Sequence, residues 1–92
     1  MASGDATVSV ALMEAPAGWS EPAQTPQFDE VTVVLEGEVV IETDQGPVVV
    51  VAGQGFVARA GERIRYACPK GARYIAVCAP AFSPDTVNRE DG

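Results

Sequence analysis

Short valine-rich runs separated by turn residues constrain this chain more than any other feature of its sequence. The runs recur at intervals of about ten residues and are bounded by glycine, proline and acidic residues, which is typical of short strands. No window keeps an apolar period of about 3.6 residues, so no helix is indicated. The expected strands cover residues 8–12, 31–35, 39–41, 48–51, 56–58, 64–68 and 74–78. The pattern predicts an all-β protein, either a sandwich or a small barrel.

The length of 92 residues limits the chain to one small domain with a single core. We expect that domain over residues 1–92, with its core at about 7–84 and loose polar ends. Residues 15–27 contain three prolines and one tryptophan, and we expect an ordered loop or an irregular strand there. No apolar stretch approaches the roughly 18 residues of a membrane span, and no signal peptide is visible. We therefore expect a cytoplasmic protein without a membrane partner.

Glycine-containing turns are expected at residues 36–38, 44–46 and 69–71, because glycine adopts a positive φ at little cost. The turn at 69–71 would pair the strands on either side of it in a hairpin, with Tyr66 opposite Tyr74. Cys68 and Cys78 would then lie roughly 20 Å apart, at opposite ends of the hairpin. A disulfide requires Cα atoms within about 7 Å. We therefore expect two free, buried cysteines.

The chain contains no histidine, and this absence excludes several kinds of chemistry. Ser-His-Asp and Cys-His catalysis within one chain is excluded, as are metal sites built on histidine. Two cysteines cannot form a Cys₄ metal site without a partner chain. Thirteen acidic against six basic residues give a net charge of −7, which argues against nucleic acid and anionic membranes as partners.

The order of acidic residues and glycines over residues 24–80 resembles that of a known family. An acid opens a valine-rich strand in Phe28-Asp-Glu-Val-Thr-Val-Val-Leu-Glu-Gly-Glu38, and Gly46, Ala52-Gly-Gln-Gly55 and Arg59-Ala-Gly-Glu-Arg63 follow. These segments resemble the two sequence motifs of the cupins, which are single small antiparallel β-barrels of the jelly-roll type. Within that family the chain is most similar to the ethanolamine-utilisation Q-type proteins and small stand-alone relatives. Those proteins also have Asp-Glu before the valine strand and lack the metal-binding histidines.

The resemblance also indicates where a metal is bound in other cupins. Those positions correspond to Gln24, Pro26, Glu30 and Ile64 in this chain, so that only the glutamate is retained. One glutamate with a glutamine is a poor site for a transition metal. The sequence therefore predicts a cavity without a metal and without another cofactor.

Alternate residues of each strand point into a small barrel, and this alternation selects candidate site residues. Glu30 is the candidate general acid or base, and Tyr66 and Tyr74 are candidate hydrogen-bond donors to a developing oxyanion. Each has a plainer interpretation, since Glu30 could lie on the surface and the tyrosines could simply fill the barrel. The expected ligand-binding residues are Trp19 as a lid, Gln24, Phe28, Thr32, Arg59, Ile64 and Cys78.

Five of the six basic residues lie between residues 59 and 73, whereas residues 1–58 carry nine acids and no base. One interpretation is that this basic strip faces acids such as Glu36, Glu38 and Glu42, within the barrel or across a dimer. The other is an anion site, in which an inward Arg59 binds a substrate carboxylate through both guanidinium nitrogens.

Two classes of function fit these observations. The first is a metal-independent enzyme, an isomerase, cyclase, lyase or decarboxylase that acts on a small carbonyl or aromatic compound. The second is a non-catalytic accessory protein that binds a small anionic or aromatic organic molecule. A homodimer is expected in either case, because a chain this small gains stability from association. A purely structural, oligomerising unit is a third possibility.

Overall fold

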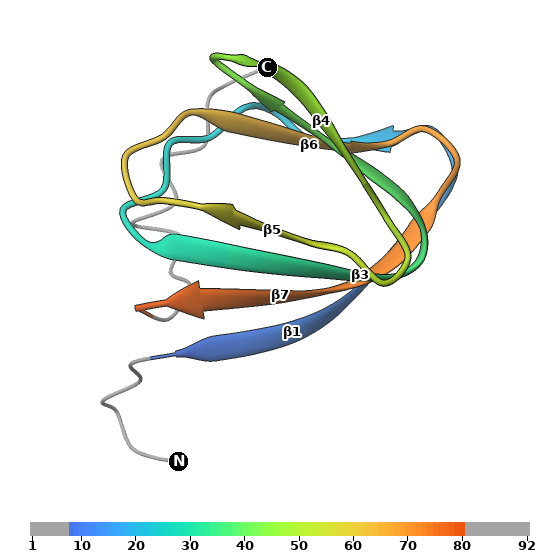
Figure 1. Ribbon diagram of the computed structural model, residues 1–92, viewed down its shortest axis with the longest axis horizontal. Helices are drawn as coiled ribbons and strands as arrows, with labels where there is room; N and C mark the ends of the chain where they lie inside the picture. The colour runs from blue at the N-terminus through green and yellow to red at the C-terminus, as the bar shows by residue number, and fades with distance from the viewer. Residues whose placement is uncertain (1–7, 81–92) are drawn as a thin grey trace.

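The computed structural model describes residues 8–80, which form seven strands and no helix. The strands are β1 (Ser9–Ala15), β2 (Trp19–Ser20), β3 (Asp29–Thr43), β4 (Gly46–Val51), β5 (Gly55–Ala58), β6 (Ile64–Cys68) and β7 (Ala72–Ala79). All strand pairs are antiparallel, and the sheet curls into a small barrel (Figure 1). The expected all-β fold is confirmed, whereas the loose ends expected at 1–6 and 85–92 lie outside the described residues. Among residues 8–80 there is no helix with the length and apolar character needed to cross a membrane.

The long strand β3 belongs to both sheets of the barrel. Its first half pairs with β7 and β5, and β1 extends this first sheet at the other side of β7. Its second half pairs with β4 and β6, and β2 extends this second sheet beyond β6. The strand orders are therefore β1-β7-β3-β5 in the first sheet and β4-β3-β6-β2 in the second. The two inner faces meet because one strand crosses from sheet to sheet.

Gly37 lies where β3 passes between the sheets. The register of β3 against β7 shifts between Val34 and Glu36, and Gly37 has a φ of 80°. A Cβ atom at this position would overlap the carbonyl oxygen of Gly71. The positive φ is confirmed, but the turn expected at 36–38 is wrong, because β3 is continuous from Asp29 to Thr43. Glycine here permits a close backbone approach within a bent strand.

The hairpin expected between residues 64–68 and 72–76 is also wrong. The turn itself forms, with the amide of Gly71 donating to the carbonyl of Cys68 at 3.1 Å and a φ of 82° at Gly71. However, β6 pairs with β3 and β2, so that Tyr66 lies opposite Ile41, while β7 pairs with β1 and β3. The turn leads from one sheet to the other because each strand must direct its apolar side toward the shared interior. Both cysteines are free and buried as expected, although the hairpin argument for them does not hold.

The core follows the alternation of the central strands. Glu30, Thr32 and Val34 of β3 are buried, and Ile64, Tyr66 and Cys68 of β6 are buried as well. Most of the buried side chains form one continuous cluster, to which Trp19 adds a partly buried indole. Phe28 and Cys78 form a second, smaller cluster. The inward faces predicted for these strands are therefore observed.

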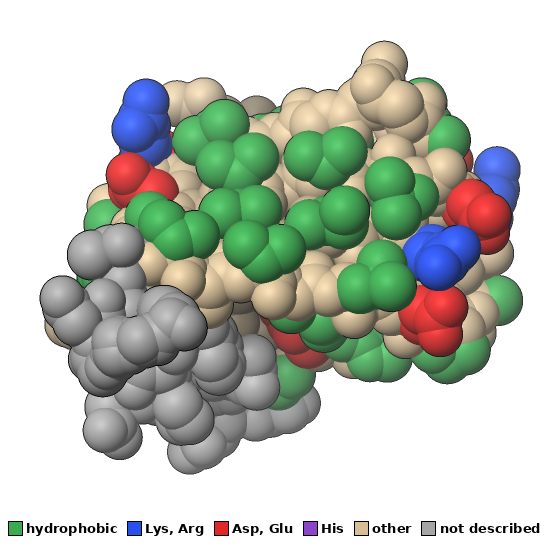
Figure 2. Space-filling view, turned by 90° about the horizontal axis from the view of Figure 1, so that it is seen from below, with side chains coloured by type: hydrophobic (Ala, Val, Ile, Leu, Met, Phe, Trp, Pro, Cys, Tyr) green, Lys and Arg blue, Asp and Glu red, His purple; other side chains and the backbone are tan. Residues whose placement is uncertain are grey.

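The outer face of the first sheet is apolar as well. Its outward residues form two rows across the strands: Val10, Val77, Val31 and Val57 in one, and Leu12, Ile75 and Val33 in the other. We call this surface the outer apolar face. Val10 is 67% exposed and Leu12 is 53% exposed, although both have large apolar side chains. Figure 2 shows hydrophobic side chains gathered across one side of the molecule, with charged groups at its margins.

The basic strip is paired with acids from the first half of the chain. The ion pairs are Arg59–Asp29 at 3.5 Å, Arg65–Glu42 at 2.8 Å, Lys70–Glu38 at 3.8 Å and Arg73–Glu14 at 3.4 Å. All four lie at the surface, where such pairs contribute little to stability. The interpretation in which the strip faces acids of the same barrel is therefore confirmed for Glu38 and Glu42.

Candidate functional site

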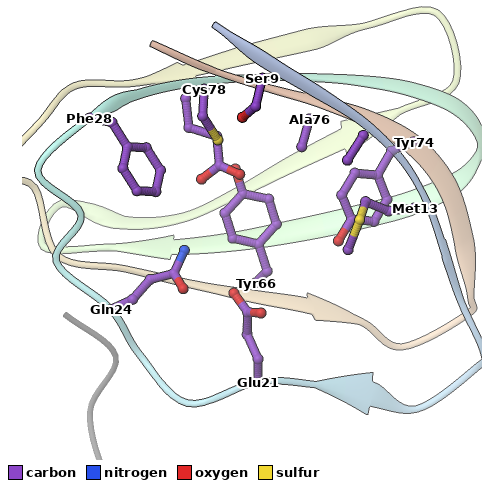
Figure 3. Close-up of a pocket in the computed structure, with 11 residues that line it drawn as sticks. Ser9, Met13, Glu21, Gln24, Phe28, Tyr66, Tyr74, Ala76 and Cys78 are labelled. Carbon is purple, nitrogen blue, oxygen red and sulfur yellow. The ribbon is translucent and has the colours of Figure 1, made fainter. Parts of the chain in front are cut away.

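A cavity of about 400 Å³ opens between the inner face of the first sheet and the segment that leads from β2 to β3 (Figure 3). This volume lies within the range of pockets that hold small organic ligands. The lining residues come from four strands and that segment: Ser9, Ala11, Met13, Glu21, Gln24, Phe28, Glu30, Tyr66, Tyr74, Ala76 and Cys78. Apolar side chains thus provide most of the wall, and a few polar groups converge on it.

Strand register explains why these side chains share one wall. On β1 and β7, alternate residues face each other as Ser9 with Cys78, Ala11 with Ala76 and Met13 with Tyr74. Glu30 of β3 lies opposite Cys78 on the other side of β7. The small side chains in the middle of this wall leave the space that becomes the cavity. Tyr66 enters from the second sheet and lies at the centre of the group in Figure 3.

The two tyrosines form the aromatic part of the pocket. Their ring centroids are 6.2 Å apart with an interplanar angle of 26°, which is a stacked arrangement. The hydroxyl of Tyr66 shares a hydrogen bond of 2.6 Å with Oγ1 of Thr32. Because Thr32 is on β3 and Tyr66 is on β6, this bond joins the two sheets inside the barrel and holds the Tyr66 ring in place.

Both phenols remain protonated near neutral pH. Burial, followed by the negative charge of Glu30, raises the pKa of Tyr66 far above its usual value. Burial raises the pKa of Tyr74 as well, with smaller contributions from Cys68, Glu21 and Glu30. A neutral phenol can donate a hydrogen bond to a ligand oxygen but does not act as a base. The tyrosines therefore suit the role of hydrogen-bond donors.

The thiol in the pocket is not an activated nucleophile. Burial and the nearby Glu30 raise the pKa of Cys78 to about 11, so the thiolate is scarce at neutral pH. Burial also raises the pKa of Cys68, which belongs to the core. Covalent catalysis by either thiol is therefore disfavoured.

Six of the ten site residues expected from the sequence line this one cavity. They are the three candidate catalytic residues Glu30, Tyr66 and Tyr74, together with Gln24, Phe28 and Cys78. Glu30 is only 9% exposed, so the interpretation of this residue as a surface acid does not hold. The structure thus brings the candidate acid or base and both candidate donors into one pocket.

The other four expected residues lie elsewhere. Thr32 is fully buried and supports the Tyr66 hydroxyl without lining the cavity, and Ile64 packs in the main core. Trp19 pairs with Cys68 through β2 and packs against the core, so it is not a lid over the pocket. The Arg59 side chain is 73% exposed beside Asp29, and the expected carboxylate clamp is therefore wrong. Arg59 follows the end of β5, at the surface of the barrel.

Four lining residues were not expected from the sequence: Ser9, Ala11, Met13 and Glu21. The side of β1 that faces the cavity carries small or flexible side chains, those of Ser9, Ala11 and Met13. The opposite side carries the bulkier Val10 and Leu12 and faces outward. The usual rule that the more apolar face of a strand is buried selects the wrong side of β1. Glu21 lies in the irregular segment after β2, where no periodicity indicates direction. The alternation in β1 was visible, but the sequence does not indicate which side faces the cavity.

A family model for the ethanolamine utilisation protein EutQ matches residues 5–83 of this chain. The chain belongs to the EutQ family. The resemblance to ethanolamine-utilisation Q-type cupins, drawn from the acid-and-glycine pattern around residues 28–63, is confirmed.

Similar proteins support the same fold. Endoribonuclease YbeY of Myxococcus xanthus is 43% identical in an alignment 90 residues long, which covers 91% of this chain but only 29% of that protein. The EutQ protein of Clostridium difficile is 27% identical with a TM-score of 0.73, over 80% of this chain and 53% of its own. An RmlC-like cupin from Shewanella frigidimarina is 22% identical with a TM-score of 0.77, over 86% and 70% of the two chains. The EutQ-family chain therefore has the cupin, or jelly-roll, fold and spans only part of the length of these relatives.

Three of the four positions that correspond to cupin metal ligands, Gln24, Glu30 and Ile64, lie near one another in this EutQ-family barrel. Gln24 and Ile64 form a β-bridge, and Gln24 and Glu30 line the same pocket. Ile64 and Pro26 offer no donor side chain, so the set is reduced to one carboxylate and one amide. Within residues 8–80 no three His, Cys, Asp or Glu side chains are grouped so that they could hold a metal ion. This donor set does not fit a transition metal, which takes at least three protein ligands in typical catalytic sites.

Proposed function

We propose that this EutQ-family protein binds a small organic molecule in the barrel cavity and transfers a proton on it without a metal. The observation that carries the proposal is the convergence of Glu30, Tyr66 and Tyr74 on one cavity of about 400 Å³. Glu30 would remove or return the proton, and a tyrosine would donate a hydrogen bond to the oxygen on which charge develops. This division of roles fits an isomerase, cyclase, lyase or decarboxylase.

The environment supports these separate roles. Both tyrosines keep their protons, and the Cys78 thiol keeps its proton as well, so Glu30 is the strongest candidate for a base among these neighbours. Thr32 fixes the Tyr66 hydroxyl through the hydrogen bond of 2.6 Å. A donor held in place before the reaction stabilises a developing oxyanion more than a mobile one does.

Hydrogen–deuterium exchange tests the proton transfer without requiring knowledge of the natural substrate. A panel of small aromatic ketones is incubated with the protein in D₂O, and deuterium uptake beside the carbonyl is followed by NMR. The wild type is expected to accelerate the exchange, and Glu30→Gln is expected to abolish the acceleration while the fold is kept. Glu36→Gln is the matched control, because Glu36 is exposed outside the cavity. Equal acceleration by Glu30→Gln would disprove the role of Glu30.

The alternative is an accessory protein that binds its ligand without converting it. The cavity supports this function equally, since its wall is mostly apolar and orients a ligand with few polar groups. Binding would then raise the melting temperature, with about 2.7 kcal/mol of stabilisation at a hundredfold excess of ligand over Kd. Stabilisation with no exchange on any bound ketone would favour this alternative over catalysis.

The proposal does not include the endoribonuclease activity named for the Myxococcus xanthus relative. That relative matches over only 29% of its length. The basic side chains Arg59, Arg65, Lys70 and Arg73 are ion-paired with acids at the surface, and the net charge is −7. This distribution is unsuited to a phosphate backbone, which requires a basic surface.

We further propose that a second copy of the chain covers the outer apolar face. The two rows of valine, leucine and isoleucine side chains extend over all four strands of the first sheet, and β1 is an edge strand of this sheet among the described residues. Contiguous apolar surfaces of this kind in monomers are rare and mark association sites. The same surface on two copies is self-complementary in a two-fold dimer. Because β1 also lines the cavity, association would stabilise the strand that carries Ser9, Ala11 and Met13.

Light scattering coupled to size-exclusion chromatography tests this association. The wild type is expected to elute as a dimer, and the double variant Val10→Lys, Leu12→Lys is expected to elute as a folded monomer. Val49→Lys is the control, because Val49 is 54% exposed on β4, which belongs to the other sheet. A wild-type monomer at all concentrations, or an unchanged dimer in the double variant, would disprove this interface.

A further inference from the structure

We propose that the cavity is specific for a small organic cation, a protonated amine joined to an aromatic or apolar group. This inference rests on the proposed function, since it names the class of molecule that the same pocket takes. The observation behind it is that the charged side chains on the cavity wall are two carboxylates, Glu21 and Glu30. Among the described residues that line the cavity there is no lysine and no arginine.

The two carboxylates reach the cavity from different parts of the chain. Glu30 is on β3 of the first sheet, whereas Glu21 follows β2 and lies beneath the Tyr66 ring in Figure 3. Burial is the main cause of the raised pKa of Tyr66 and of Tyr74, and the negative charges of Glu30 and Glu21 add to it. The tyrosine pair is therefore within electrostatic reach of both acids. A positive charge placed beside the rings would interact favourably with each carboxylate.

The rest of the wall fits the remainder of such a ligand. The stacked tyrosines, 6.2 Å apart, offer aromatic surface, and aromatic ring faces attract cations. Phe28, Ala76 and Met13 provide apolar contacts, and the thioether of Met13 adapts to ligands of different shape. An ammonium group would lie between the carboxylates and the rings, while its apolar substituent would lie against the small residues of β1 and β7.

The distribution of basic residues argues against an anion in this pocket. Arg59, the residue expected to bind a carboxylate, lies at the surface with Asp29. A carboxylate ligand would therefore meet Glu30, which is only 9% exposed, without a compensating positive charge from the wall. Like charges brought together in a partly buried site repel strongly, because solvent screens them poorly. Selectivity for cations over anions follows from this arrangement.

Binding of three molecules of similar shape and different charge tests the proposal. Benzylammonium, benzyl alcohol and benzoate are titrated into the full chain at neutral pH, and binding is followed by calorimetry and by NMR. Benzylammonium is expected to bind roughly tenfold or more tightly than benzyl alcohol, as is typical of hydrogen bonds to charged groups, and benzoate is expected not to bind. Glu21→Gln and Glu30→Gln should each reduce this preference by roughly tenfold, whereas Glu36→Gln, with the same change in net charge, should not.

The outcomes separate this inference from the proposed function. Tighter binding of benzyl alcohol or benzoate would overturn the cationic class while leaving the cavity as a binding site. Benzylammonium binding that persists in Ala11→Trp, a variant that fills the cavity from the edge strand, would overturn the cavity as the site. Failure of all three molecules to bind would count against both proposals. A preference that survives in both pocket glutamine variants would show that the selectivity arises elsewhere.

Discussion

The hydrogen bond between Thr32 and Tyr66 is expected to make a measurable contribution to the stability of the barrel. Both side chains are buried, at 0% and 2% exposure, and their oxygens are 2.6 Å apart. Thr32→Val preserves the shape of the side chain but leaves the Tyr66 hydroxyl without this partner. Tyr66→Phe likewise leaves the Thr32 hydroxyl without its hydrogen-bond partner. Each single change should lower the free energy of unfolding by about 1–3 kcal/mol, since a buried polar group then loses its hydrogen bond.

The double variant distinguishes this bond from a general loss of packing. When both partners become apolar, no buried hydroxyl of the pair is left unsatisfied, so the combined loss should be smaller than the sum of the two single losses. The expected coupling is about 1–2 kcal/mol, which lies well above the scatter of roughly 0.5 kcal/mol between independent sites. Urea unfolding at neutral pH, monitored by circular dichroism, measures all four proteins under the same conditions.

Tyr74→Phe provides the control for this cycle. Tyr74 also lines the cavity but takes no part in the Thr32–Tyr66 bond, so loss of its hydroxyl should cost less than loss of the Tyr66 hydroxyl. In thermal unfolding, each kcal/mol corresponds to roughly 4–8 °C for a domain of this size. Additive losses for Thr32→Val and Tyr66→Phe would refute the reasoning, because they would show that the two hydroxyls act independently.

Further changes test other features of the structure. Gly37→Ala should lower the free energy of unfolding by roughly 2–5 kcal/mol, because the new Cβ would overlap the carbonyl oxygen of Gly71 and the backbone at this position is left-handed. A thermal melt measures the loss, and a loss below about 1 kcal/mol would contradict this close approach. Iodoacetamide should alkylate Cys78 slowly at neutral pH, and the rate should reach half of its maximum only at about pH 11. A plateau of the rate near pH 9 would contradict the raised pKa. The folded state holds the Cys78 proton more tightly than the unfolded chain does. The contribution of this group to the free energy of unfolding is therefore complete below the ordinary thiol pKa of 9.0 and is lost as the pH rises through about 11. In urea titrations at alkaline pH, Cys78→Ala should make the free energy of unfolding fall less steeply with pH. Arg59→Ala should change ligand affinity less than twofold and the free energy of unfolding by less than about 1 kcal/mol, because the ion pair of Arg59 with Asp29 lies at the surface. A marked loss of affinity would show that Arg59 contributes to the binding site.

The alternation of the central strands allowed much of the site to be predicted from the sequence. Glu30, Thr32 and Val34 are two residues apart, and the same spacing places Tyr66 on the buried side of β6. Because side chains alternate along any strand, an inward Glu30 requires an inward Thr32. The cupin-like order of acids and glycines then indicated which side of β3 faces the interior. Those two facts were sufficient to place Glu30 and Tyr66 in the interior. The inward Tyr74 was predicted from the hairpin between β6 and β7, which does not form, although Tyr74 does line the cavity.

Strand partners could not be predicted in the same way. A tight turn at Gly71 is compatible both with a hairpin and with a crossing between sheets, and the local sequence is the same in either case. The chain crosses between the sheets at this turn because β3 is long enough to pair with β6 along one half and with β7 along the other. That choice depends on barrel closure, which involves residues more than twenty positions away.

The sequence by itself determined where the strands lie, which side of β3 and β6 is buried, and that no histidine chemistry is available in this chain. Only the tertiary structure decided that β1 turns its small side chains toward the cavity, that Glu21 joins Glu30 there, and that Arg59 stays at the surface. The physical reason is that periodicity defines the two faces of a strand but not what covers each face. In this barrel both faces of the first sheet carry apolar side chains, so the polarity of a side chain does not indicate whether it faces the cavity or the outer apolar face.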